Sequence, residues 1–309
     1  MAFTAKDVQK LREQTGAGMM DCKKALTSSD GDFEKAIEFL REKGLAAAAK
    51  KAGRVAAEGA AYATVCAECG VAALVEINSE TDFVAKNDEF KKFCADVATA
   101  IMVEAPADLE ALGACKYPGS DLTVVDMQRE KVLTIGENIQ IRRFDRYDNT
   151  TMNIPYIHAG GKIGVLVALE VSDNLRGNEK IVEMGKDICM QIAAMRPQWL
   201  NRADVPEATL AKEKEILLAQ TINEGKPAAV AEKIVLGRIG KFYEENCLVD
   251  QAFVKENKIS VSKYVDRVAA EQGGTAKIVK FTRFERGEGI AKREDNFAEE
   301  IAKLTGGAN

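Results

Sequence analysis

The spacing of apolar residues predicts a β-hairpin followed by an amphipathic helix in the first third of the chain. Apolar runs at 62–65 and 71–77 flank a turn at residues 68–70, which is a hairpin pattern. Apolar side chains then recur at helical spacing, and they are Phe90, Phe93, Cys94, Val97, Ala98 and Ile101. Residues 104–122 contain two prolines and are expected to form loop and short helix.

The same order of elements recurs further along the chain. Runs at 154–158 and 163–171 flank Gly160-Gly161, and the helix that follows carries Ile181, Met184, Ile188, Ile192 and Met195 on one face. An alternating strand at 137–144 precedes this second copy, and another at 278–284 is expected to join the second sheet. We therefore predict a duplicated hairpin-plus-helix core.

Three short helices are predicted at the start of the chain. Thr4 and Asp7 have the spacing of a capping box, and the glycines of residues 15–18 end the first helix. A second helix is expected at 19–26. A third begins after the 30–32 turn and is expected to end at Gly44, with residues 45–58 as a linker helix.

The second half of the chain predicts a helical hairpin. Helical stretches at 210–222 and 228–242 meet at Gly225-Lys226-Pro227, where glycine and proline together favour a reversal. A last helix is expected to carry Ile290, Phe297, Ile301 and Leu304. The fold class is α+β, and we expect five parts: a three-helix module (1–54), a core N-subdomain (55–144), a core C-subdomain (145–205), a hairpin insertion (206–250) and a C-terminal return strand and helix module (251–309).

Composition favours a protein partner over a nucleic acid or a membrane. The 309 residues carry a net charge of −5 and a pI near 5.4, with 46% hydrophobic and 29% charged residues. The first residues lack the pattern of a signal peptide, and the seven scattered cysteines do not suggest a disulfide framework. We expect a cytoplasmic protein, bacterial rather than organellar.

The sequence carries none of the common catalytic signatures. No glycine precedes a Gly-Lys pair at the spacing of a phosphate loop, and the single histidine, His158, rules out histidine-pair metal sites. Cys66 and Cys69 form a lone CxxC pair that could be half a zinc site or a redox couple. Because a redox pair of this kind should open a helix, we expect two ordinary turn cysteines here.

Three features have both a structural and a functional interpretation. Met19 and Met20 are adjacent and cannot both face one core, so at least one is expected at the surface, where methionine suits an adaptable protein contact. Phe83, next to Asp82 at a strand end, is either a core aromatic or a partner contact. His158 lies where a strand meets a turn, and it is either structural or functional.

Two blocks of sequence are the most specific features of the chain. Residues 15–26 read Thr-Gly-Ala-Gly-Met-Met-Asp-Cys-Lys-Lys-Ala-Leu, and residues 81–86 read Thr-Asp-Phe-Val-Ala-Lys. Further blocks follow in order at 135–139, 158–167, 224–227, 251–254 and 283–290. On these blocks the chain resembles the elongation factor Ts family over nearly its whole length, except that Ala252 and Lys255 replace a proline and a methionine usual in that family.

The resemblance implies a fold and a partner. The fold would comprise a ubiquitin-associated-like three-helix module, two related α+β subdomains, a protruding helical hairpin and a C-terminal module. The partner would be the GTPase elongation factor Tu, on which the family exchanges guanine nucleotide without covalent chemistry or a cofactor. Thr81, Asp82, Phe83 and Val84 would intrude near its magnesium and phosphates, and further contacts would come from Arg12, Met19, Met20, Lys23, His158, Phe253 and Val254.

Two other classes of function stay open at this stage. The alternative is a ubiquitin-associated-like adaptor whose first module binds a different partner. A redox or zinc enzyme that uses Cys66 and Cys69 is the third. A homodimer through the helical hairpin or the core is a further partnership that the sequence leaves open.

Overall fold

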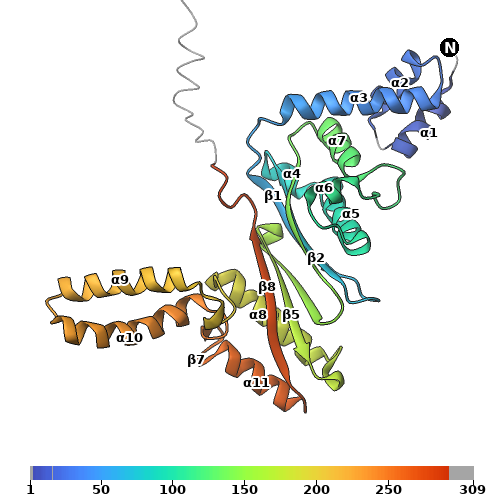
Figure 1. The fold of residues 1–309 in the computed structure, drawn as a ribbon. Helices are drawn as coiled ribbons and strands as arrows, with labels where there is room; N and C mark the ends of the chain where they lie inside the picture. Colours follow the sequence, from blue (N-terminus) through green and yellow to red (C-terminus); the bar gives the residue numbers. More distant parts are fainter. Residues whose placement is uncertain (1–2, 16, 292–309) are drawn as a thin grey trace, which may run out of the picture.

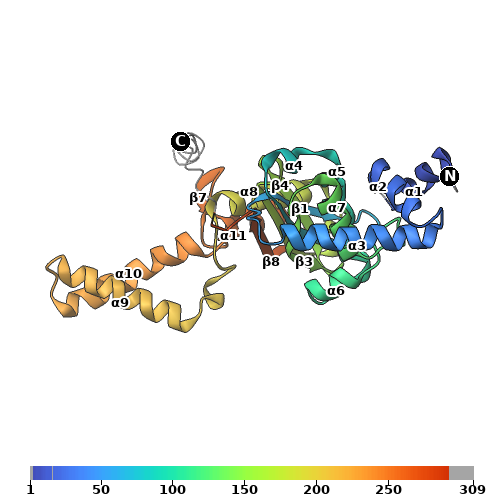
Figure 2. The same ribbon diagram turned by 90° about the horizontal axis from the view of Figure 1, so that it is seen from above.

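Two three-stranded antiparallel sheets pack face to face, and helices cover their outer faces (Figure 1). The structure is a computed structural model, and it describes residues 3–15 and 17–291. Mixed helix and antiparallel sheet agree with the predicted α+β class. The three-helix module and the helical hairpin lie at opposite ends of an elongated molecule (Figure 2).

The N-terminal module contains α1 (Ala5–Thr15), α2 (Met19–Ser28) and α3 (Phe33–Lys51). Thr4 and Asp7 form the expected reciprocal cap, and the Asp32 side chain accepts hydrogen bonds from the backbone N–H groups of Glu34 and Lys35. The expectation that the third helix ends at Gly44 was wrong. Gly44 is buried where α3 crosses α7, and this packing outweighs the roughly 1 kcal/mol cost of a glycine in a helix.

The first sheet has the order β1-β2-β3, formed by β1 (Glu58–Val65), β2 (Ala72–Ser79) and β3 (Gln140–Tyr147). Its outer face is covered by α5 (Asp88–Glu104) and α7 (Val124–Ile135), and α4 (Asp82–Lys86) and α6 (Leu109–Ala114) complete this half. The hairpin and the helix after it confirm the predicted first unit. The sequence did not predict α7, whose buried face includes Val124, Met127 and Val132.

The second sheet has the order β4-β5-β8, formed by β4 (Met152–His158), β5 (Ile163–Val171) and β8 (Ala276–Glu285). The predicted return strand is confirmed, because β8 pairs antiparallel with β5, with residue 163 opposite residue 285. Its outer face is covered by α8 (Glu179–Met195) and α11 (Val261–Glu271), and a small ladder joins β6 (Ala252–Phe253) to β7 (Glu256–Ser260).

Small side chains allow the two sheets to lie close together. Ala61 and Ala63 of β1 and Leu74 of β2 share one buried cluster with Leu166 and Ala168 of β5. A Cβ atom added at Gly164 would lie 2.6 Å from a methyl carbon of Leu74, so this position admits only glycine without a shift of the sheets. As a result β2 is buried at every position along its length.

The predicted helical hairpin is confirmed as α9 (Glu207–Asn223) and α10 (Ala228–Asn246), which project from the second sheet (Figure 1). Arg238 fastens its tip, because the guanidinium donates to Thr221 Oγ1 at 3.2 Å and to both carboxylate oxygens of Glu224. Short 3₁₀ turns occur at η1 (Ala159–Gly161), η2 (Asp173–Leu175) and η3 (Arg202–Asp204). The last predicted helix lies almost wholly beyond residue 291, outside the described residues.

Candidate partner-binding surface

The short helix α4 presents an aromatic side chain to solvent. Thr81 caps this helix, and its hydroxyl accepts a hydrogen bond from the backbone N–H of Val84 at 3.4 Å. Ala85 is buried and Val84 is half-buried against the first core, so the helix turns its opposite side outward. Phe83 lies on that side with 80% of its surface exposed, more than any other large apolar side chain that the structure describes.

The chain segment that enters α4 is held by Glu137. One carboxylate oxygen accepts hydrogen bonds from the backbone N–H groups of Glu80 and Thr81, both at 3.0 Å. The other accepts the Thr81 hydroxyl at 2.6 Å. Glu80 reciprocates, since its carboxylate accepts the backbone N–H of Asn138 at 2.6 Å. These bonds fix where β2 ends, and therefore where Phe83 stands.

A charged pair stands beside the exposed ring. Lys86 Nζ lies 2.6 Å from Asp82 Oδ2 and 5.9 Å from the centroid of the Phe83 ring. The hydrogen bond from Lys86 lowers the pKa of the Asp82 carboxyl, and the positive charges of Lys86 and Arg286 add to this effect. Asp82 is therefore a carboxylate at neutral pH, next to a solvent-facing aromatic ring.

His158 lies at the same end of the first hairpin as α4. Residue 79, after which the chain enters α4, pairs with residue 58 at the start of β1, and Gly161 of η1 packs against Ala60. The imidazole is exposed, and its Nδ1 lies 3.1 Å from the hydroxyl oxygen of Tyr156. Arg286 joins these pieces, because it pairs with Glu58 at 2.8 Å and donates to the Gly59 carbonyl. The structure thus brings His158 and the Asp82–Phe83 segment to one region.

The predicted contact residues of the N-terminal module form a separate group. Met19 and Met20 are 43% and 66% exposed, which confirms the prediction that at least one lies at the surface. Arg12 and Lys23 are exposed as well. The group lies on α1 and α2, at the far end of α3 from α4 (Figures 1 and 2).

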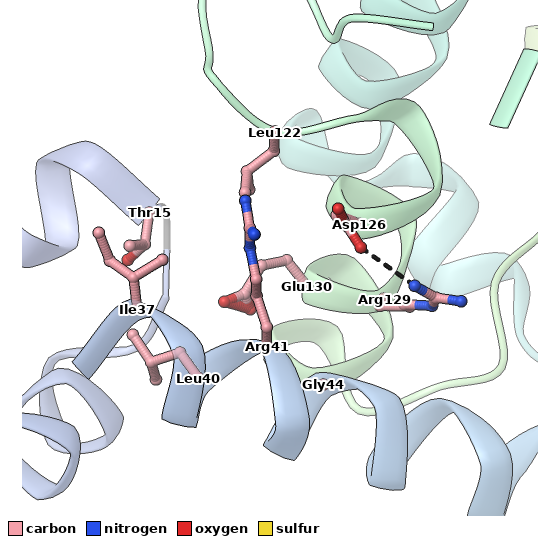
Figure 3. A pocket seen from close by; sticks show the side chains of 9 residues that line it. All are labelled: Thr15, Ile37, Leu40, Arg41, Gly44, Leu122, Asp126, Arg129 and Glu130. Atoms are coloured by element: carbon pink, nitrogen blue, oxygen red, sulfur yellow. Dashed lines mark hydrogen bonds and ion pairs between the residues drawn. The ribbon is translucent and has the colours of Figure 1, made fainter. Parts of the chain in front are cut away.

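A cavity of about 20 Å³ marks the joint between this module and the first subdomain. Figure 3 shows Glu130 extending from α7 toward α3 in this cavity, near Leu40 and Arg41. Burial raises the pKa of Glu130 to about 7, and its Oε2 has no hydrogen-bond partner among the described residues. The contact between the N-terminal module and α7 therefore contains a carboxyl group that resists ionisation.

Of the neighbouring residues Phe253 and Val254, the first lies in the core and the second at the surface. Phe253 is only 2% exposed and stacks on Tyr264 with the ring centroids 4.0 Å apart. Its ring therefore cannot touch a partner in this structure, contrary to what the resemblance implied. Val254 is 45% exposed, and its backbone N–H donates to the buried Gln191 at 2.8 Å. The neighbouring Lys255 is occupied by an ion pair with Asp187 at 2.6 Å.

Sequence reasoning missed three residues of this surface, which are Lys86, Glu137 and Arg286. Lys86 could have been found from its spacing of four residues from Asp82, the spacing of a helical ion pair. Glu137 had no comparable signal, because its partners lie 56 and 57 residues away in the chain. Arg286 likewise contacts residues of β1 from the other end of the sequence.

Metal-binding clusters and membrane-spanning helices are two further features that bear on function, within residues 3–15 and 17–291. This part of the chain holds no cluster of three or more His, Cys, Asp or Glu side chains arranged for a metal ion. None of its helices has both the length and the apolar composition needed to cross a membrane.

Comparison with known proteins gives a consistent result. A family model described as Elongation factor TS matches residues 80–288. Elongation factor Ts of Clostridium perfringens (strain SM101 / Type A) is 51% identical over 305 residues, which cover 98% of this chain and 99% of that protein. Elongation factor Ts of Syntrophotalea carbinolica is 47% identical over 306 residues, covering 99% and 100%. That of Clostridium kluyveri is 49% identical over 303 residues, covering 97% and 98%.

Proposed function

Because this chain belongs to the elongation factor Ts family, we propose that it binds elongation factor Tu carrying GDP and accelerates the release of GDP, so that GTP can replace it. The observation that carries the proposal is Phe83, an aromatic ring 80% exposed on a short helix that hydrogen bonds hold in place. Covering this ring with a partner would remove a large apolar surface from water, which contributes favourably to binding.

The proposed action of Phe83 is that of a wedge. The ring enters the GTPase domain near the magnesium ion and the phosphates of the nucleotide, and it separates the elements that hold them. Because Glu137 and Thr81 fix the base of α4, the wedge is already ordered before binding, and little conformational entropy is lost on insertion. Asp82 enters with it as a carboxylate, which repels the phosphates and competes there electrostatically or as a hydrogen-bond acceptor.

This action requires no covalent chemistry. An exchange factor binds the nucleotide-free partner more tightly than the loaded one, and by reciprocity it weakens nucleotide binding by the same factor. Each 1.4 kcal/mol of this coupling lowers nucleotide affinity about tenfold. A few kcal/mol from one buried aromatic ring and the contacts around it is therefore enough for a large acceleration.

The remaining surface residues supply binding energy away from the nucleotide. We assign Arg12, Met19, Met20 and Lys23 to a second contact with the GTPase domain, since flexible methionine side chains adapt to an irregular surface. His158 extends the contact around Phe83. Val254, in place of the buried Phe253, makes the contact on the C-terminal half.

Stopped-flow release of a fluorescent GDP analogue from elongation factor Tu tests the proposal. We expect the release rate to rise with the concentration of this protein and then to saturate. An unchanged rate at saturating protein, together with binding of the N-terminal module to an unrelated partner, would support the adaptor alternative instead.

A further inference from the structure

The turn between β1 and β2 places two cysteine side chains against each other. The carbonyl of Cys66 accepts the backbone N–H of Gly70 at 2.9 Å, so residues 66–70 form one helical turn at the hairpin tip. Within it the backbone N–H of Cys69 points at Cys66 Sγ, with the nitrogen 3.3 Å from the sulfur. The tip therefore has the local geometry of a single helical turn, although a strand and not a helix follows it.

The turn is held in this shape from two sides. The backbone N–H of Cys66 donates to the carbonyl of Val71 at 2.8 Å, across the neck of the hairpin. Asn153 Nδ2 donates to the carbonyl of Gly70 at 2.9 Å from the other subdomain. Residues three apart in a turn have Cα atoms less than about 7 Å apart, which is the separation that a disulfide spans. The two sulfurs can therefore join without unfolding the hairpin.

Both thiols reach the surface, and the Cys66 thiol is also activated. Cys66 is half-buried and Cys69 is exposed. Hydrogen bonds from the Cys69 thiol and from the backbone N–H groups of Cys69 and Glu68 lower the pKa of Cys66. Cys115 is half-buried too, but its Sγ donates to the carbonyl of Ala111 and burial raises its pKa. Cys115 is thus a matched control within the same chain.

We propose that Cys66 and Cys69 form a reactive dithiol that undergoes thiol–disulfide exchange with low-molecular-weight disulfides such as oxidised glutathione. The Cys66 thiolate attacks one sulfur of the disulfide, whose S–S bond breaks, and the released thiolate takes a proton from water. Cys69 then loses its proton to water and attacks Cys66 Sγ, so that the mixed S–S bond breaks and the second half of the original disulfide leaves as a thiolate, which takes a proton from water. In balance, the protein loses two hydrogens and one disulfide becomes two thiols.

The dithiol stands apart from the proposed exchange surface. It joins the ends of β1 and β2 at residues 65 and 72, whereas α4 follows the opposite end of this hairpin. Oxidation of the pair is therefore expected to leave GDP release unchanged.

The test uses the full-length reduced protein incubated with oxidised glutathione near pH 7, then quenched with acid, alkylated and mapped by mass spectrometry. We expect a peptide with a Cys66–Cys69 disulfide, formed roughly tenfold faster than any adduct on Cys115, since thiolate fraction governs the rate. In Cys69→Ser the glutathione adduct on Cys66 should accumulate, because the resolving thiol is absent. In Cys66→Ser, Cys69 should react more slowly than Cys66 does.

Two outcomes would overturn the proposal. One is a Cys66 that reacts no faster than Cys115 in the unmodified protein, a measurement that needs no variant to fold. The other is a Cys69→Ser protein in which no adduct on Cys66 builds up.

Discussion

Glu137 holds Thr81 by two hydrogen bonds, one from the Thr81 backbone N–H at 3.0 Å and one from its hydroxyl at 2.6 Å. The residues lie on different elements of the first subdomain, at the end of β2 and just before β3. Because α4 begins directly after Thr81, this pair sets the position of Phe83. It joins the interior of the fold to the exposed ring.

The pair gives a prediction about positioning. Thr81→Val removes the hydroxyl, which leaves one Glu137 oxygen and the helix cap unsatisfied, so GDP release should slow several-fold. Thr81→Ser keeps the hydroxyl and should exchange at the normal rate. We expect Thr81→Val to lose about 1–2 kcal/mol of stability. Both exchange rates are measured by stopped flow at matched folded fraction. Equal rates in the two variants would show that the Glu137–Thr81 hydrogen bond is not needed for exchange.

Phe83→Ala should impair exchange far more than stability. The ring is 80% exposed, so its removal costs the free protein little packing. The control is Phe93→Ala, since Phe93 is fully buried under the first sheet and should lose about 3–5 kcal/mol. Urea unfolding and nucleotide release on both variants distinguish the two roles. A Phe83→Ala protein that unfolds early yet exchanges normally would make Phe83 structural.

Substitutions at Phe253 and Val254 should likewise differ, the first affecting stability and the second affecting binding. Phe253→Ala removes a buried ring stacked on Tyr264 and should cost about 3–5 kcal/mol of stability. Val254→Ala removes an exposed side chain, so it should leave the melting temperature nearly unchanged while weakening binding to elongation factor Tu. Thermal unfolding of both variants measures their stability, and calorimetric titration measures their affinity for elongation factor Tu. If Val254→Ala binds with unaltered affinity, the C-terminal contact lies elsewhere.

Glu130 gives a prediction about pH. Burial raises its pKa to about 7, whereas an unfolded chain has the ordinary value near 4.5, so the folded state holds this proton more tightly. Between pH 4.5 and 7 the unfolded chain releases the proton first, and stability therefore falls as pH rises through this window. The loss is at most about 3 kcal/mol and is complete above pH 7.

Glu130→Gln removes this ionisation while keeping the shape of the side chain. The variant should be more stable than the parent at pH 8 and about equally stable at pH 4.5. Asp126→Asn is a suitable control, because Asp126 lines the same cavity but pairs with Arg129 at 3.0 Å. Thermal unfolding of the three proteins at both values of pH decides the point; an equal gain for Glu130→Gln at both would contradict it.

The elements that sequence predicted well are those whose pattern is local. The two hairpins, the helix bearing Phe90 and Ile101, and the 225–227 reversal each follow from neighbours within a few residues. The end of α3 was missed because Gly44 is stabilised by contact with Arg129, far along the chain. The helix α11 was overlooked although Val261, Val265 and Ala269 have helical spacing.

The surface was predictable in part. The block at 81–86 pointed to the exposed ring, and the adjacency of Met19 and Met20 required that one be exposed. Phe253 shows the limit, because nothing in its neighbourhood reveals that Tyr264 covers the ring. Glu137 shows the same limit, because the sequence around an acidic residue ahead of a strand does not reveal from which distant N–H groups it will accept hydrogen bonds.

The position of β8 determines the order in which this protein can fold during its synthesis. The central strand β5 pairs residue 163 with residue 285, and the whole helical hairpin is made between them. Every helix of the N-terminal module and every strand of the first sheet lies before residue 148, so these parts can form before the second sheet. The second sheet must wait with one side of β5 unpaired until the last described strand emerges, and unpaired strand edges are where chains associate wrongly. A truncation before residue 276 would therefore leave an aggregation-prone chain, even though every residue of the proposed contact surface except Arg286 would be present.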